Sequence, residues 1–168
     1  MSAKCECGSV CSVETGKPFR TGPDIFRGIL SGFVGTVAIT LMIYFVAPMM
    51  VGTQMDIAGM LGSLLGGNWW AGLGMHFLNG TIIFPLLFAF LLCSVLPGSL
   101  VLKGVTWGVI LWVLAQVVVM PMMGMGLFSG SMLAAGGSLM GHLVYGVVLG
   151  GVYGLKSAPA SAPRPVRA

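Results

Sequence analysis

The sequence predicts an all-α fold, a bundle of four transmembrane helices. Hydrophobic residues make up 57% and charged residues only 7% of the 168-residue chain, whereas soluble domains carry roughly a quarter charged residues. Four apolar stretches are each long enough for the about 20 helical residues that cross a bilayer. Because lipid offers no partner for backbone polar groups, such stretches must be helical. The lipid bilayer is therefore the expected surroundings of most of the chain.

The first half of the chain has three parts. Residues 1–26 are polar and contain a cysteine cluster, so we expect a flexible cytoplasmic tail. The first span covers about 27–50, and Pro48 suits its end because proline interrupts helical hydrogen bonding. Apolar residues recur at near-helical spacing in 52–68, which predicts a short interfacial helix between the first two spans. A loop packed over the mouth of the bundle is the alternative.

The remaining spans follow with short connections. Trp69 and Trp70 form an aromatic anchor at the water boundary and begin the second span, about 69–93. A tight turn containing Pro97 and Gly98 comes next. The later segments are the third span (100–122), the fourth span (132–155) and a disordered cytoplasmic tail (156–168).

The positive charges indicate the topology. Four spans place both termini on one side, and every basic residue falls on that side, while the loops 52–68 and 124–130 contain none. The eight are Lys4, Lys17, Arg20, Arg27, Lys103, Lys156, Arg164 and Arg167. Since cytoplasmic loops carry the excess of Lys and Arg, we expect both termini in the cytoplasm and the protein in the bacterial inner membrane. The basic residues are too few and scattered for nucleic-acid binding.

The two halves of the chain share a pattern. A basic-Gly-x3-Gly start, a Pro-Met-Met end and a His-x2-polar-Gly motif occur twice in the same order. The pairs begin at Arg27 and Lys103, Pro48 and Pro121, and His76 and His142. This pattern favours a duplicated two-helix unit with a pseudo-twofold axis along the membrane normal; chance similarity between glycine-rich apolar segments is the alternative. In an up-down bundle the second and fourth spans are diagonal neighbours, so the two histidines are expected to face each other.

His76 and His142 are the only histidines, and both lie inside spans. An ionisable side chain at membrane depth is costly and marks a candidate functional site. Two opposed imidazoles could be the axial ligands of haem b, ligands of another metal, or part of a proton path. The structural alternative is a polar network across helices, with Asn79, Tyr145, Gln116 or Thr81 as partners.

Sulfur-containing side chains are the second candidate for metal binding. Most of the 13 methionines lie toward the predicted outer face, and their thioethers suit a Cu(I) ion. We select Met49, Met50, Met122 and Met123 as candidate ligands; methionine as an adaptable apolar filler is the alternative. Cys5, Cys7 and Cys11 form a C-x-C-x3-C cluster that could bind Cu(I) or Zn(II), or could be incidental thiols in a tail.

No arrangement typical of an enzyme is present. The sequence contains no pair of carboxylates, no Ser/His/Asp pattern and no phosphate-binding glycine loop, so we expect no catalytic activity. Three functions remain open. They are haem or metal binding, copper transport or handling, and a structural role, in which glycine-rich helix faces pack against a larger membrane complex or a second copy.

Several motifs carry a resemblance to a known family. They are Gly35 to Thr40, Met55-Asp56-Ile57, Leu61-Gly62, His76-Phe77, Trp107-Gly108, Trp112, Met120 to Gly124, and His142 to Gly146. Over about 28–154 the chain resembles a family of small bacterial four-span membrane proteins of unknown function. The resemblance implies an integral membrane protein and no established activity. The cysteine cluster lies outside the matched part.

Overall fold

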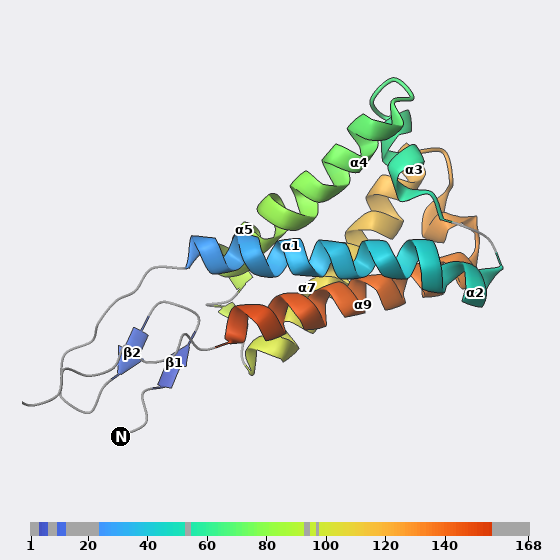
Figure 1. Cartoon of the computed structure of the whole chain (residues 1–168). Coiled ribbons are helices and arrows are strands. Elements are labelled where there is room, and N and C mark those ends of the chain that lie inside the picture. Colours follow the sequence, from blue (N-terminus) through green and yellow to red (C-terminus); the bar gives the residue numbers. More distant parts are fainter. Residues whose placement is uncertain are drawn as a thin grey trace, which may run out of the picture.

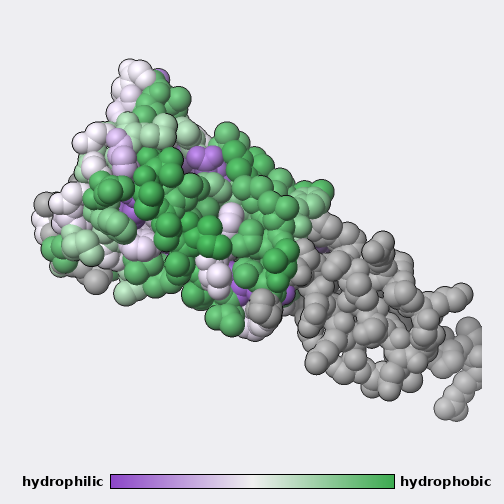
Figure 2. Space-filling model, turned by 180° about the vertical axis from the view of Figure 1, so that it is seen from behind, coloured by the Kyte–Doolittle hydropathy of each residue, from purple (hydrophilic) through white to green (hydrophobic). Residues whose placement is uncertain are grey.

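The computed structural model describes residues 4–6, 10–12, 24–52, 55–92, 95–96 and 98–155. Within them, four helices are long and apolar enough to cross a membrane: Ile25–Met49, Trp69–Leu92, Leu100–Met122 and Met132–Gly154. The predicted spans agree with these four ranges to within two residues at each end. Large hydrophobic side chains stay exposed along all four helices, and Figure 2 shows apolar side chains over most of the coloured part of the face in view. The molecule is a multi-pass membrane protein with an all-α fold.

Short polar side chains begin the helices. The first span starts with α1 (Ile25–Leu41), where Asp24 accepts a hydrogen bond from the Arg27 backbone at 3.0 Å. Capping of this kind satisfies backbone N–H groups that have no partner within the helix. Later helices begin in the same way at Asp56, Asn68, Ser99 and Ser131. The caps define where each helix starts more sharply than hydropathy does.

Three of the four spans contain a π-helical segment ahead of a proline. In the first span, η1 (Met42–Val46) precedes α2 (Ala47–Val51), which contains Pro48. The third span has α7 (Leu100–Leu114), η4 (Ala115–Val119) and α8 (Met120–Met122), with Pro121. In both spans the proline follows the π segment by two residues. The wider turn accommodates the ring, which would otherwise clash with a carbonyl one turn earlier. Pro48 therefore lies in the last turn of the helix, which runs on to Val51.

The second span is the most divided. It consists of α4 (Trp69–Leu78), η2 (Asn79–Ile83), α5 (Phe84–Leu87) and η3 (Phe88–Leu92), with Pro85 in α5. In contrast, α9 (Met132–Gly154) contains no proline and is continuous over 23 residues. Between the spans lie α3 (Ile57–Ser63) and the 3-10 helix η5 (Leu127–Gly130). The expected helix between the first two spans is thus confirmed as α3.

The four spans pack side by side, and their contacts give their order around the bundle. The fourth span contacts the first and the third most extensively, and η2 and α5 pack on α1 (Figure 1). The second and fourth spans are diagonal, as predicted. Glycines allow the closest approaches, because a Cβ at Gly104 would collide with the carbonyl oxygen of Gly146. In the first half, Gly32 approaches the Gly80 carbonyl oxygen of the second span in another close contact.

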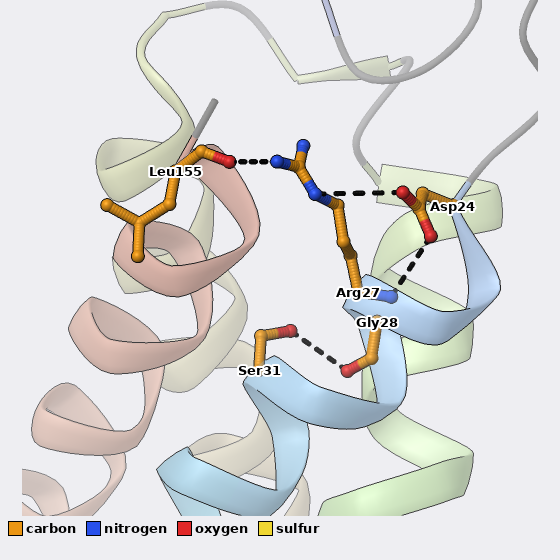
Figure 3. Close-up of polar contacts among 5 residues, drawn as sticks. All are labelled: Asp24, Arg27, Gly28, Ser31 and Leu155. Atoms are coloured by element: carbon orange, nitrogen blue, oxygen red, sulfur yellow. Dashed lines mark hydrogen bonds and ion pairs between the residues drawn. The ribbon is translucent and has the colours of Figure 1, made fainter. Parts of the chain in front are cut away.

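One end of the bundle holds the start of α1 and the end of α9 together (Figure 3). The Arg27 guanidinium donates a hydrogen bond to the Leu155 carbonyl and lies 3.6 Å from the Asp24 carboxylate. Lysine or arginine suits this position because carbonyls at a helix C-terminus lack intrahelical donors. We name this the inner end, and the opposite end, which carries α3 and η5, the outer end.

Two short antiparallel strands precede the bundle, β1 (Lys4–Glu6) and β2 (Val10–Ser12), and Cys5 lies opposite Cys11 in their register. Most of the tail predicted to be flexible, and the whole of 156–168, lie outside the described residues. The flexibility of both tails remains a prediction.

Candidate functional site: an intramembrane cavity with two histidines

A cavity of about 170 Å³ lies among the four spans, and α3 forms part of its wall. Its lining is predominantly apolar. The polar side chains in the lining are those of Thr36, His76, Asn79, Ser138, His142 and Tyr145. The structure therefore brings the two predicted site histidines, from the second and fourth spans, to one shared space.

The hydrogen bonds of His76 determine which ring nitrogen is available. Nε2 lies 3.0 Å from Oγ1 of Thr40, and that hydroxyl donates its proton to the Thr36 carbonyl at 2.6 Å. A hydroxyl has only one proton to give, so with that proton on the Thr36 carbonyl we assign Nε2 of the neutral ring as the donor toward Thr40. Nδ1 then carries the lone pair, and no hydrogen bond among the described residues reaches it.

His142 is oriented by its own helix. Nδ1 lies 2.8 Å from the carbonyl oxygen of Ser138. A carbonyl can only accept, so Nδ1 carries the proton and Nε2 the lone pair. Within the part of the chain that the structure describes, Nε2 has no hydrogen-bond partner. Both histidines line the cavity, and each ring has one nitrogen in a hydrogen bond and the other with its lone pair.

A second layer of polar side chains supports the His142 side of the cavity. Gln116 is buried in η4 and donates from its amide nitrogen to the Ser138 hydroxyl at 3.2 Å. Its amide oxygen accepts from the Ser129 hydroxyl of η5 at 2.9 Å. Because Ser138 also accepts from His142, this network connects the ring to the loop at the outer end.

A π-helical turn explains the remaining polar contact. In η2 the Phe84 N–H bonds to the Asn79 carbonyl, five residues back. In the same register the next donor would be residue 85, which is proline and has no N–H. The Gly80 carbonyl is therefore left without a helical donor, and the Tyr145 hydroxyl fills the position at 2.7 Å. This bond connects the diagonal second and fourth spans.

Replacing Tyr145 by phenylalanine should lower the free energy of unfolding by about 1–3 kcal/mol, because a buried carbonyl loses its only donor. Tyr153→Phe is the matched control, since the buried Tyr153 hydroxyl makes at most a weak contact with the Asp24 backbone. Reversible unfolding in mixed detergent micelles measures both variants. Equal stability of the two would show that the Tyr145 bond contributes nothing.

A family comparison agrees with the architecture. The model of a family of unknown function (DUF6789) matches residues 23–163, which include all four spans. The chain belongs to this family. The resemblance noted in the sequence, to small four-span membrane proteins of unknown function, is thereby confirmed. No curated protein and no solved structure matches the chain.

The methionines that line the cavity of this family member differ from those selected in the sequence. Met49 and Met122 are exposed, Met123 is half-buried, and none of the three lines the cavity. The side chain of Met50 lies outside the described residues. The thioethers in the lining belong to Met42, Met55, Met60 and Met120. Met42 and Met120 lie on the same spans as the selected methionines, whereas Met60 lies in α3 and Met55 just before it.

The cysteine cluster is not joined to the cavity in the described structure. Cys5 and Cys11 are known only by their backbone register, and Cys7 lies outside the described residues. Within the described residues, no three side chains from His, Cys, Asp and Glu gather into a metal-binding group. A metal ion in the cavity would therefore need thioether, hydroxyl or amide ligands beside the two imidazoles.

A polar cluster at the outer end fixes α3. Asp56 Oδ1 accepts hydrogen bonds from the Gly59 backbone at 3.0 Å, the Trp69 indole at 3.0 Å and the Tyr44 hydroxyl at 3.1 Å. These donors lie on α3, α4 and η1. The Gly59 bond is the main reason that the pKa of Asp56 lies below its usual value, and the two side-chain donors act in the same direction.

This lowered pKa has a consequence for stability. A carboxyl group with a lower pKa in the folded state stabilises the fold above its unfolded pKa of about 3.9, and this contribution is lost as the pH falls below that value. We expect the wild-type unfolding temperature to fall below about pH 4 more steeply than that of Asp56→Asn. Parallel pH profiles for the two proteins would contradict this assignment.

Sequence patterns did not reveal the partners of the histidines. The structure gives Thr40 and Ser138 in place of Asn79, Tyr145, Gln116 or Thr81. Thr40 lies on a different span, so its proximity depends on how α1 and α4 cross. Ser138 lies four residues before His142, which is one turn of helix, and that spacing was a usable signal.

Proposed function

We propose that the cavity binds a transition-metal ion, with Nδ1 of His76 and Nε2 of His142 as ligands. The supporting observation is that each ring donates its N–H group to an acceptor in the protein. The other nitrogen of each ring therefore keeps its lone pair. Metal-binding histidines typically donate their second nitrogen to a carbonyl or another acceptor, which fixes the tautomer. A ligand that accepts hydrogen bonds, such as a quinone carbonyl, would find no donor on either ring.

Cu(I) is the metal ion that the lining favours. Four thioethers share the cavity with the imidazoles, and soft sulfur ligands select Cu(I) over harder cations. The predominantly apolar wall also favours a cation of low charge, because the cost of burying charge rises steeply with its magnitude. The protein then acts by binding or passing copper, without catalysis.

Haem b is a second candidate, since two histidines on facing spans can provide both axial ligands. The volume argues against it. At about 170 Å³, the cavity is smaller than the about 300–1,000 Å³ of sites for drug-sized ligands, and a porphyrin would require the helices to separate. A Soret band in the purified protein would favour haem over copper.

We place the protein in the bacterial inner membrane with both termini in the cytoplasm. The support is the distribution of its eight basic residues and the positive-inside rule. In this orientation α3 and the cavity mouth face the outside. If neither copper nor haem binds and a stoichiometric membrane partner co-purifies, an accessory-subunit role replaces the metal-binding proposal.

The cavity methionines provide the test of copper binding. In a protein with Cys5, Cys7 and Cys11 replaced by serine, Met60→Leu with Met120→Leu should weaken Cu(I) binding at least about tenfold, the loss of about 1.4 kcal/mol. Leucine preserves volume, so the fold should tolerate it. Met49→Leu with Met122→Leu is the matched control on exposed positions. Titration against a chromophoric Cu(I) chelator measures both, and equal affinities would contradict the assignment of copper to the cavity.

A further inference from the structure

Part of the cavity wall belongs to a helix outside the four spans. Ile57, Met60 and Leu61 of α3 line the cavity, together with Met55 just before the helix. The segment therefore covers the cavity toward the outer end, and a ligand that arrives from that end must pass it. The question is whether α3 is fixed to the bundle or can move.

The packing of α3 is almost entirely against α4. A Cβ on Gly62 would lie 2.6 Å from the Asn68 carbonyl oxygen, and one on Gly72 would collide with the Ala58 carbonyl oxygen. Ala58 itself is fully buried. Backbones this close cannot slide independently, so α3 and α4 form one rigid unit.

This unit has little contact with the rest of the bundle. Gly72, which lies under α3, is the buried residue of α4, whereas α9 buries seven residues. Figure 1 shows α4 diverging from α1 toward the outer end. From Gly80 onward the chain is buried in the bundle, at Gly80, Pro85, Phe88 and Ala89.

The junction has the features of a hinge. A π-helical segment and a proline follow one another between Asn79 and Leu87, and sharp bends in helices occur at such positions. On the outer side, the Tyr44 hydroxyl bond to Asp56 connects the unit to η1. Halfway along, the Thr40 contact with His76 connects α4 to α1.

We infer that α3 and α4 are a gate that turns about η2 and Pro85 to open the cavity at the outer end, with the Tyr44–Asp56 hydrogen bond as its latch. The proposed metal site supplies the reason for such a gate. The movement itself depends only on packing, hinge and latch. Opening would separate His76 from Thr40 and move it away from His142, so a metal ion held by both rings would keep the gate closed.

Reactivity of a thiol in the cavity wall tests the gate. In full-length protein with all four native cysteines replaced by serine, Ala115→Cys places a thiol in the cavity wall. Tyr44→Phe removes the latch and should raise the alkylation rate by a hydrophilic reagent about fivefold, the effect of one ordinary hydrogen bond. Tyr153→Phe, the same chemical change in the core, should leave the rate unchanged. Equal rates in the two tyrosine variants would overturn the inference.

A second measurement does not require a thiol in the cavity. Spin labels at Leu65 and Met125, both exposed, report the distance between the gate and the loop after the third span. Tyr44→Phe should add a longer distance, and an unchanged distribution would also overturn the gate. Both measurements are made without metal. If Tyr44→Phe opens the gate but Cu(I) slows neither alkylation nor opening, the metal-site proposal fails while the gate stands.

Discussion

Replacing either His76 or His142 by alanine is expected to lower Cu(I) affinity by at least about a hundredfold, because each ring supplies a nitrogen ligand and changes in the outer shell alone cost 10–100-fold. The cavity offers two such nitrogens, so loss of one leaves mainly weak thioether ligands. Competition with a Cu(I) chelator, in protein lacking Cys5, Cys7 and Cys11, gives the affinity.

Thr40→Val is a milder variant for comparison, and it should have an intermediate effect on Cu(I) affinity. It keeps the His76 ring but removes the acceptor that fixes its proton on Nε2. We expect an intermediate loss of about 10–100-fold in affinity, with an unchanged unfolding temperature in metal-free protein as a check on the fold. If both histidine variants bind copper as tightly as the wild type, the imidazoles are not ligands, and the polar-network interpretation becomes the better account.

The second large effect concerns the contact between the third and fourth spans. Gly104→Ala combined with Gly108→Ala should destabilise the protein by about 1–3 kcal/mol per site, the usual cost of overpacking. The added Cβ atoms would collide with the carbonyl oxygens of Gly146 and His142. Because the His142 backbone would shift with α9, we also expect weaker metal binding.

Gly136→Ala combined with Gly151→Ala is the matched control on α9, where a Cβ meets nothing within 4 Å. Both pairs replace glycine by alanine within helices, and alanine is the better helix former by about 1 kcal/mol. The control should therefore be neutral or stabilising. Detergent-induced unfolding measured by near-ultraviolet circular dichroism compares the two. A similar response of both pairs would show that the close helix contact is not what holds these spans together.

The sequence predicted most of the fold because lipid imposes simple constraints. Apolar length alone placed all four spans, and the repeat of His-x2-polar-Gly placed both histidines at one cavity. Hydropathy could not determine which face of each helix points inward. For that reason Met49 and Met122 were selected although Met42 and Met120, about two turns and less than one turn away, line the cavity.

The details that orient the histidines depend on three-dimensional features. In the first three spans the π segments turn the residues that follow them to a different face of the helix. A regular helical repeat does not include this change. The partnership of Thr40 with His76 follows from the crossing of two spans. The role of α3 as a cavity wall follows from its glycine contacts with α4, since its apolar residues alone equally fit a helix lying on the membrane surface.

X-ray absorption at the copper edge is the most direct test of the proposed site. With one equivalent of Cu(I) bound to protein lacking Cys5, Cys7 and Cys11, we predict a spectrum with two imidazole nitrogens and at least one thioether sulfur. Loss of an imidazole contribution in His142→Ala would complete the assignment. A protein that binds no copper, or a spectrum without imidazole scattering, would contradict the account.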